Sequence, residues 1–285
     1  MANLRAIRTR IKGVESTRQI TKSMKMVAAA KLRRTQTAFS TLRDFADESA
    51  KVLREVSGGG VETANPFLLP HSEVKRVCYV LVVGNRGLCG TYNHALLRYV
   101  EDLARHDGRE SFLVVCGRWG KDLIPGTGIP VERSFDNISD TPGTADAHEL
   151  SAYLRELYLS GQADEIILVY QRYKSVLQQI PDKKQLLPLT PGDGPAESGR
   201  YLFEPDRETL LDNLVNMYID NTVHATLLEA RTGEHSARMT AMTSAADNTE
   251  ELIAELTLEL NHARQAAITT EISEIAGGAE ALKNK

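Results

Sequence analysis

The residues best placed for nucleotide chemistry are three glycines, Gly84, Gly87 and Gly90. They follow a short apolar run, Val77–Val83, and precede a stretch with helical patterning at 92–105, which is the setting in which glycine-rich loops cradle phosphate groups. Their spacing is GxxGxxG instead of GxGxxG, and no Gly-Lys-Ser or Gly-Lys-Thr sequence follows. The spacing therefore favours a tight structural turn. A nucleotide-dependent enzyme using this loop is the alternative, and it would require that the isolated chain bind ATP.

The second chemical candidate is Cys89, which lies in the same loop at the predicted start of a helix. A thiolate is favoured at a helix N-terminus, so a reactive thiol is one interpretation, and a small buried hydrophobic residue is the other. The remaining cysteines, Cys78 and Cys116, complete an odd number with no CxxC spacing. This pattern predicts neither a disulfide framework nor a zinc site, and it fits a reducing compartment.

Other catalytic patterns are missing from the sequence. The seven histidines form no HxxxH or HExxH pair, no GxSxG motif occurs, and no pair of carboxylates stands out for acid–base chemistry. We therefore expect no catalytic residue, no metal site and no cofactor.

The distribution of proline indicates which elements position these residues. All ten prolines fall between Pro66 and Pro205, so both ends of the chain lack the residue that most often breaks a helix interior. A helix over 3–56 would be roughly 80 Å long and one from 207 to the end up to roughly 115 Å, whereas a compact domain of the intervening size is about 40 Å across. We therefore expect two long helices that project from one globular body as a shaft.

The N-terminal segment has a heptad seam that is apolar at both ends and polar in the middle, from Arg18 to Lys25. The polar middle has two interpretations: an imperfect helix pair, or a seam that no longer faces its helical partner there. Ser57 and the glycines at 58–60 predict the end of this helix, and Glu204-Pro205-Asp206 predicts the start of the second. The seam positions are Leu4, Ile7, Ile11, Val14, Arg18, Thr21, Lys25, Ala28, Leu32, Thr35, Phe39, Leu42 and Ala46.

Charge differs between the two ends. The first 34 residues contain ten Lys and Arg residues, Lys31 among them, against the single acid Glu15, whereas the last 80 residues are acidic in excess. Complementary charge favours pairing of the two ends, although solvent screening keeps the preference modest. The remaining positive charge is either a solvated face or a surface for an acidic partner.

The middle of the chain predicts a small α/β domain. Apolar runs at 77–83, 112–116 and 166–170 are typical of buried strands, and they alternate with helical patterns at 92–105 and 149–159. This alternation predicts a Rossmann-like domain with a mostly parallel sheet and right-handed crossovers. We expect three parts: an N-terminal shaft helix at 1–60, a globular foot at 61–205 and a C-terminal shaft helix at 206–285.

Composition limits the classes of partner. The net charge of −4 gives no indication of a polyanionic partner, and no apolar run is long enough to cross a membrane. The N-terminus begins directly with helical patterning and has no signal-peptide core, so no cleaved targeting segment is expected.

Three separated stretches carry a specific resemblance to a known family. They are ITKSMKMVAAAK at 20–31, RGLCG at 86–90 and ARQAAIT at 263–269, the last in a segment that also contains EHSARM at 234–239 and EIAGGA at 274–279. In this order they resemble the gamma subunits of bacterial F-type ATP synthases, the central rotor shafts of those complexes. The resemblance covers effectively the whole chain.

The resemblance implies an architecture and a set of partners. It implies an antiparallel coiled coil inside a ring of alpha and beta subunits, with the α/β domain as a foot near the epsilon subunit and the membrane c-ring. It further implies one copy per complex, a peripheral position on the cytoplasmic face of the bacterial cell membrane, and no catalytic activity of the chain itself. By the same resemblance, ion flow turns the foot, and the asymmetric shaft couples rotation to ATP synthesis or hydrolysis.

Residue roles follow only by matching the family motifs. In the polar middle of the first helix the resemblance places Lys22, Met24 and Lys25 against the alpha/beta ring, and in the second helix it places Arg264, Gln265 and Thr269 there. An arginine would suit acidic loops of the ring, because its planar fork binds carboxylates at two points. Contacts of the foot with epsilon or the membrane ring are expected near Tyr201 and Phe203.

Three residues at two sites depart from the family pattern. Gly84-Asn85 stands where the family more often has Ser-Asp, which puts a polar contact from that pair in question, and Gly233 replaces a more usual serine and could soften the second helix locally. No chloroplast-type cysteine pair is present, so thiol switching is not expected.

A different class of function is the alternative. A coiled-coil nucleic-acid-binding protein could use the basic N-terminal helix as its electrostatic surface. The chain lacks interleaved aromatic residues in that helix and is acidic overall, so we expect no nucleic-acid partner. Salt-sensitive retention on DNA would support this alternative.

Overall fold

The computed structural model describes residues 2–57, 65–122, 124–189, 204 and 206–283. These residues form two compact units. The first consists of Met1–Val27 with Met239–Lys285, and the second of Ala28–Arg238. The long helices α1 (Ala2–Ser57) and α4 (Arg207–Lys283) each contribute residues to both units. The three-part division predicted from the sequence remains a prediction.

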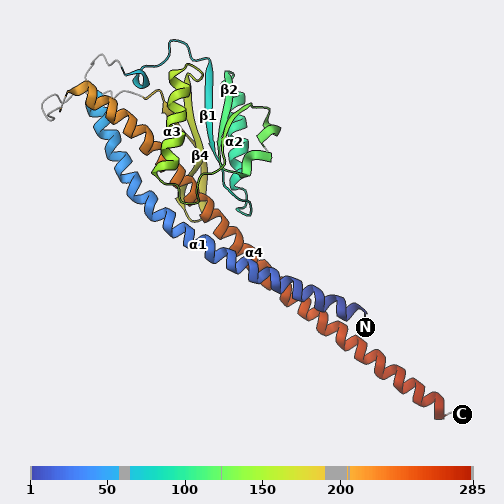
Figure 1. The fold of residues 1–285 in the computed structure, drawn as a ribbon. Coiled ribbons are helices and arrows are strands. Elements are labelled where there is room, and N and C mark those ends of the chain that lie inside the picture. Colours follow the sequence, from blue (N-terminus) through green and yellow to red (C-terminus); the bar gives the residue numbers. More distant parts are fainter. Residues whose placement is uncertain (1, 58–64, 123, 190–203, 205, 284–285) are drawn as a thin grey trace. The chain divides into compact units, whose positions relative to one another are not determined.

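The second unit contains a five-stranded sheet in the order β3-β2-β1-β4-β5 (Figure 1). Strands β1 (Arg76–Val82), β2 (Glu110–Cys116), β3 (Val131–Phe135) and β4 (Glu165–Ser175) run parallel, and β5 (Gln178–Leu187) pairs antiparallel with β4. The predicted mostly parallel α/β sheet is therefore confirmed. Strands β3 and β5 were not predicted.

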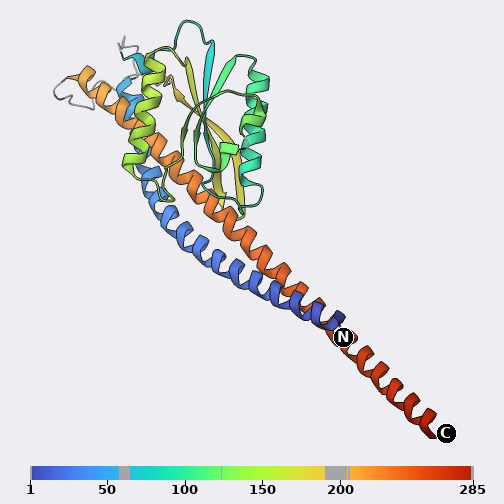
Figure 2. The same ribbon diagram turned by 45° about the vertical axis from the view of Figure 1, so that its right-hand side comes forward.

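Alternate side chains of β1 point to opposite faces of the sheet, and each face has its own core. Val77, Tyr79 and Leu81 pack with Leu96 and Val100 of helix α2 (Tyr92–Asp107). Cys78, Val80 and Val82 lie in the opposite core, which helix α3 (Thr144–Leu159) and the first part of α4 cover. Figures 1 and 2 show α2 and α3 on opposite faces of the sheet. Because both faces are covered, β1 has six buried residues out of seven, as its continuous apolar run predicts.

Within the second unit, the C-terminal part of α1 packs against the N-terminal part of α4. Leu53 and Val56 of α1 share a core with Leu211 and Val215 of α4. The Arg207 side chain donates through Nε to the Val56 carbonyl oxygen at 3.2 Å. This contact satisfies a carbonyl in the last turn of α1, which would otherwise have no intrahelical partner.

The start of α4 and the end of α1 agree with the sequence signals. Asp206 precedes α4, and its carboxylate accepts hydrogen bonds from the Thr209 amide at 2.8 Å and the Thr209 hydroxyl at 2.9 Å. These contacts lower the pKa of Asp206 and cap the helix. Helix α1 ends at Ser57, immediately before the three predicted helix-terminating glycines.

The heptad seam continues through part of its polar middle. One of the two sequence interpretations instead expects the seam to stop facing its helical partner there. Thr21 and Thr35 are buried, and each hydroxyl donates to a carbonyl of its own helix, Arg18 O at 2.9 Å and Leu32 O at 3.2 Å respectively. Arg18 is half-buried, and of the three seam positions Arg18, Thr21 and Lys25 only Lys25 is exposed. The interpretation that the whole seam over 18–25 turns away from its partner was therefore wrong, because intrahelical hydrogen bonds let threonines occupy seam positions.

In the first unit, α4 extends beyond the region that has a helical neighbour. Figure 1 shows residues 4–27 beside the part of α4 that follows Met239, with the two segments antiparallel, and Figure 2 shows the same pairing. The predicted antiparallel coiled coil is confirmed here. Every residue from Ile268 to Ala279 is exposed, including Ile272 and Ile275. None of the helices in the described ranges is both long and apolar enough to span a membrane.

Candidate functional site: a buried ionic cluster on helix α4

Three charged residues of α4 are buried against the sheet in the second unit. Arg231, Glu234 and Arg238 are spaced three and four residues apart, so they lie on one face of the helix. Arg231 and Glu234 are each 1% exposed. Charged side chains are rarely so buried unless they are paired, so the cluster requires an internal arrangement of partners. We call these three residues the α4 ionic cluster.

Glu234 is held between the two arginines. Its Oε2 lies 2.8 Å from Arg231 Nη1, and its Oε1 lies 2.7 Å from Arg238 Nη2. Burial would raise the pKa of Glu234, but the two guanidinium charges outweigh burial and hold the pKa below its usual value. Glu234 is therefore ionised, and it does not serve as a proton donor or acceptor near neutral pH.

The two arginines connect α4 to the carboxyl end of β1 and the loop that follows. Arg231 donates from Nη1 to the Val83 carbonyl at 3.1 Å and from Nη2 to Asn85 Oδ1 at 2.9 Å. Arg238 donates from Nη2 to the carbonyls of Arg86 at 2.9 Å and Gly87 at 3.2 Å. Helix and loop are thus joined by guanidinium groups whose planar geometry fixes direction as well as distance.

The glycine loop is therefore a structural turn that receives an arginine. A phosphate cradle needs converging N–H groups, whereas this loop directs the carbonyls of Arg86 and Gly87 toward Arg238. The reactive-thiol interpretation of Cys89 was wrong: the side chain is buried, and burial raises the pKa of the thiol. The departure of Asn85 from the family pattern had put its polar contacts in question, but Asn85 does make such contacts.

Two glycines permit the close approach of α4. A Cβ atom at Gly84 would lie 2.9 Å from Glu234 Cδ, and one at Gly233 would lie 3.2 Å from the Tyr92 ring. Tyr92 in turn donates its hydroxyl to the Ala230 carbonyl at 2.6 Å. Gly233 thus lies where the helix packs closely on α2, and its role is steric.

A second set of polar contacts ties α1 to the same region. Lys31 Nζ lies 2.5 Å from Asp140 Oδ2, and Asn85 Nδ2 lies 3.1 Å from Asp140 Oδ1. Partial burial would raise the pKa of Asp140, but the hydrogen bonds from Lys31 and Asn85 lower it well below its usual value. His235 Nε2 lies 3.2 Å from the Asp140 carbonyl. Asp140 and Asn85 therefore link α1, α4 and the β1 loop.

The arrangement is suited to mechanical support of α4. The ionised groups are paired, and among the residues described no group of His, Cys, Asp and Glu is arranged to hold a metal ion. Directional hydrogen bonds and close packing on several sides resist sliding and rotation of α4 over the sheet. The cluster is suited to carry force from the α/β domain into a long helix.

Sequence reasoning included Arg238 and Glu234 only within the family motif and missed Arg231. One signal was available: Arg231 and Glu234 are oppositely charged at a spacing of i, i+3 in a segment otherwise rich in Ala, Thr and Ser. Asn85, which accepts a hydrogen bond from Arg231, is 146 positions away in the chain, and no helical periodicity predicts that contact.

The predicted ring-contact residues all belong to the first unit, and most of them are exposed. Met24 is half-buried. Tyr201 and Phe203, predicted to contact epsilon or the membrane ring, lie outside the residues that the structure describes. The five exposed positions are Lys22, Lys25, Arg264, Gln265 and Thr269.

Comparisons with known proteins give a consistent result. A family model described as ATP synthase matches residues 3–282. The chain is 42% identical over 286 residues to the ATP synthase gamma chain of Moorella thermoacetica, covering 99% of this chain and 100% of that one. It is 43% identical over 287 residues to the gamma chain of Desulforamulus reducens, with the same coverage.

Solved structures agree in fold. A chain from the Euglena gracilis mitochondrial ATP synthase, in a structure of its OSCP, F1 and c-ring, has a TM-score of 0.73 at 22% identity, covering 99% of this chain and 95% of that chain. A chain from the rotor of the same synthase has a TM-score of 0.69 at 20% identity, covering 94% and 99%.

Together, these matches define a subunit of an ATP synthase. The chain belongs to the ATP synthase gamma chain family, and its function is that of the central stalk in the rotor that couples proton transport to ATP synthesis. The resemblance inferred from the sequence motifs is thereby confirmed.

Proposed function

We propose that this chain is a non-catalytic rotor subunit whose α/β domain receives torque and whose α4 ionic cluster carries it into the shaft. The observation that carries this proposal is the pairing of Glu234 with Arg231 and Arg238, which in turn hold three backbone carbonyls of the sheet and its loop. A sheet that turns would act on α4 through these bonds. The chain itself need bind no nucleotide.

The ring of alpha and beta subunits is the proposed receiver of that torque. Lys22, Lys25 and Arg264 are exposed, and the described part of the chain pairs none of the three with a carboxylate. They are therefore available to acidic side chains of another subunit. Polar and apolar contacts with the same ring would come from Gln265, Thr269 and the half-buried Met24. An asymmetric shaft changes the affinity of the ring for nucleotide only through contacts that differ between ring conformations.

The α/β domain is the proposed foot, within the segment 61–205, and it would contact the epsilon subunit and the membrane c-ring. Tyr201 and Phe203 remain candidates for those contacts. The complex would hold one copy of the chain, on the cytoplasmic face of the bacterial cell membrane, as a peripheral subunit. The lack of a membrane-spanning helix among the described residues is compatible with this position.

The test is reconstitution. Combining the chain with alpha and beta subunits should yield a complex with one copy of the chain and ATP hydrolysis that neither the chain nor an incomplete mixture shows. Recovery of the ring without this chain, or ATP hydrolysis by the chain alone, would contradict the proposal.

A further inference from the structure

A second group of polar contacts joins α4 to the α/β domain, at Asp220. Helix α3 lies beside the first part of α4 (Figures 1 and 2), and three of its side chains meet the Asp220 carboxylate. Arg155 Nη1 lies 2.6 Å from Oδ1, and His148 Nδ1 lies 3.0 Å from Oδ2. The Ser151 hydroxyl donates to Oδ1. We call Asp220, Ser151 and Arg155 the α3–α4 polar contact.

The α3 residues of this contact are held in place by their own helix. His148, Ser151 and Arg155 are spaced three and four residues apart, so they lie on one face of α3. Ser151 is buried and Arg155 half-buried, whereas His148 is exposed. Partial burial would raise the pKa of Asp220, but the hydrogen bonds from these three side chains hold the pKa below its usual value. Asp220 is therefore ionised near neutral pH, and its pair with Arg155 is partly shielded from solvent.

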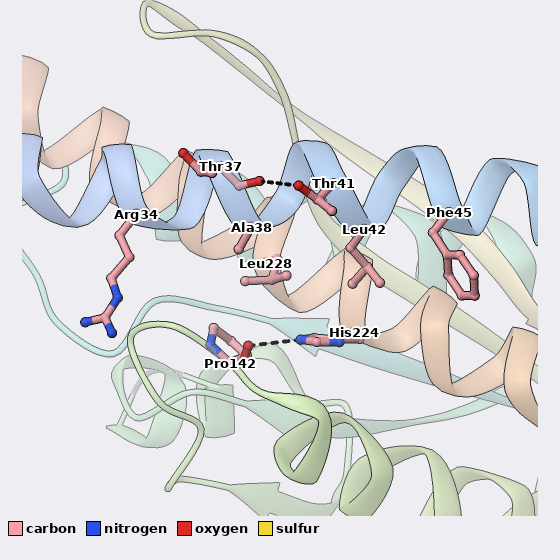
Figure 3. Close-up of a pocket in the computed structure, with 9 residues that line it drawn as sticks. All are labelled: Arg34, Thr37, Ala38, Thr41, Leu42, Phe45, Pro142, His224 and Leu228. Atoms are coloured by element: carbon pink, nitrogen blue, oxygen red, sulfur yellow. Dashed lines mark hydrogen bonds between the residues drawn. The ribbon is translucent and has the colours of Figure 1, made fainter.

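A contact on the next turn of α4 has the same direction. His224 follows Asp220 by four residues, so the two side chains lie on one face of α4. His224 Nε2 lies 3.0 Å from the carbonyl of Pro142, shortly before α3 begins (Figure 3). This face of α4 therefore contacts both α3 and the segment that leads into it.

Apolar packing between the two helices restricts rotation of α4 less than these polar contacts do. Leu150 and Leu154 of α3 share a core with Ile219 and Val223 of α4. Burial of such side chains is favourable but has no preferred direction. Hydrogen bonds to a carboxylate have a preferred length and angle, and a guanidinium group adds its planar geometry. The α3–α4 polar contact therefore defines an angle that the apolar core leaves less restricted.

Asp220 and the α4 ionic cluster lie at different levels of one helix face. Arg231 follows Asp220 by 11 residues and Arg238 follows it by 18, which at about 100° per residue are close to three and five full turns. The corresponding distances along the helix are roughly 16 Å and 27 Å. The ionic cluster holds the loop after β1, whereas Asp220 holds α3. A helix held at one level can pivot about that level, and a second level on a different element prevents the pivoting.

We infer that Asp220 is a positioning residue of the rotor, which with Ser151 and Arg155 fixes the rotational angle of α4 relative to the α/β domain. The inference rests on the proposed rotor function, since this angle matters where the domain and α4 carry torque. A domain attached through the ionic cluster alone would twist relative to α4 under load. Part of each rotation would then deform the attachment instead of turning the next element.

Angular fluctuations of a bead on the assembled complex test this inference. The native cysteines are buried, so a bead can be held on the α/β domain through Lys121→Cys while the complex is fixed by its ring. After ATP-driven rotation is recorded, a non-hydrolysable ATP analogue halts the complex, and the variance of the bead angle reports torsional stiffness. Asp220→Ala should raise this variance at least about 1.5-fold, because it leaves Arg155 unpaired. Asp247→Ala, at an exposed position of the same helix, is the matched control and should stay within about 1.2-fold of the parent.

Two further variants separate positioning from stability. Leu154→Val removes one methylene group from the core between α3 and α4 and leaves the polar contact in place. It should lower the free energy of unfolding but keep the variance within about 1.2-fold of the parent. Asp220→Arg combined with Arg155→Asp exchanges the two charges and should reverse at least about half of the increase. Should Asp220→Ala prevent assembly, Asp220→Asn must raise the variance at least about 1.3-fold.

The contrary outcomes are distinct. A variance in Asp220→Ala equal to that of Asp247→Ala, an equal increase in Leu154→Val, or no recovery on charge exchange would overturn the inference. A parent complex whose bead does not rotate with ATP would overturn the proposed rotor function and the inference with it. A rotating parent complex whose variance does not respond to Asp220→Ala would count against the role of Asp220 alone.

Discussion

Arg231 Nη1 and Glu234 Oε2 lie 2.8 Å apart, and each side chain is 1% exposed. A buried ion pair of this kind does not by itself stabilise a fold, because desolvation offsets much of the attraction. Removing one partner is nevertheless costly, since the other charge is left buried and unpaired. The pair therefore enforces one position of α4 on the sheet.

Glu234→Gln is expected to destabilise the second unit. The substitution keeps the side-chain shape but leaves Arg231 and Arg238 without their carboxylate, so the free energy of unfolding should fall by about 3–5 kcal/mol. Denaturant unfolding of the full chain measures the loss. Glu251→Gln, at an exposed position of the same helix, makes the same change in charge and should stay within about 0.5 kcal/mol of the parent chain. Equal effects of the two substitutions would show that the ionic cluster does not hold α4.

Gly84→Ala tests the close approach of the helix and the loop. The new Cβ would lie 2.9 Å from Glu234 Cδ, so we expect a loss of about 1–3 kcal/mol in unfolding free energy. Gly87 belongs to the same loop, and a Cβ there meets no atom within 4 Å. Gly87→Ala should therefore be close to neutral, and comparable losses at the two glycines would contradict the steric role of Gly84.

His235 gives the stability a pH dependence of defined sign. The residue is buried, and burial lowers its pKa below the usual 6.5 despite the opposing effect of Glu234. Arg238 Nη1 lies 3.5 Å from Nδ1, and the Asp140 carbonyl lies 3.2 Å from Nε2, which suits a neutral ring protonated at Nε2. The unfolded chain takes up a proton below pH 6.5 that the folded chain resists, so stability should decrease as the pH falls from about 7 toward 5.

Unfolding measured at several pH values checks this expectation. His235→Gln removes the titrating group and should flatten the decrease between pH 7 and 5. The contributions of Glu234 and Asp140, whose pKa values are lowered, are lost only at more acidic pH, below about 4.5. A stability that rises as the pH falls from 7 to 5, or a His235→Gln variant with the same slope as the parent, would contradict the neutral histidine.

Reversing the charge of the lysines predicted to contact the ring should change the coupling of proton transport to ATP hydrolysis more than it changes folding. We expect Lys22→Glu with Lys25→Glu to lower the ratio of proton pumping to ATP hydrolysis at least about twofold in the reconstituted complex, because like charges would face the acidic partner. Lys31 is excluded from this set, since it pairs with Asp140 and so belongs to the internal contacts. Lys12→Glu, also on an exposed face of α1, is the matched control. An unchanged ratio in the double variant would contradict an electrostatic contact between these lysines and an acidic partner.

Much of the fold was predictable because periodicity and helix breakers are local signals. The proline-free ends and the apolar runs predicted both long helices and strands β1, β2 and β4. Strand β5 was missed because the edge segment 178–187 is mostly polar and contains Pro181, a residue that edge strands tolerate. Strand β3 was missed because four of its five residues are exposed.

The site was harder to predict than the fold. The α4 ionic cluster depends on contacts between positions about 150 residues apart, such as Arg238 with the Gly87 carbonyl, and no local pattern encodes them. The polar seam positions misled for a related reason. Thr21, within the polar middle from Arg18 to Lys25, is buried with its hydroxyl bonded to a carbonyl of its own helix, a possibility that a pattern of apolar and polar residues does not include.

Single-molecule rotation tests the rotor function most directly. The three native cysteines are buried, so Lys121→Cys, at an exposed position of the α/β domain, can be biotinylated selectively to hold a bead on a complex fixed by its ring. We expect the bead to rotate in a single direction, in a motion that requires ATP and stops when ATP is removed. A bead that stays in place while the same complexes hydrolyse ATP would contradict this expectation.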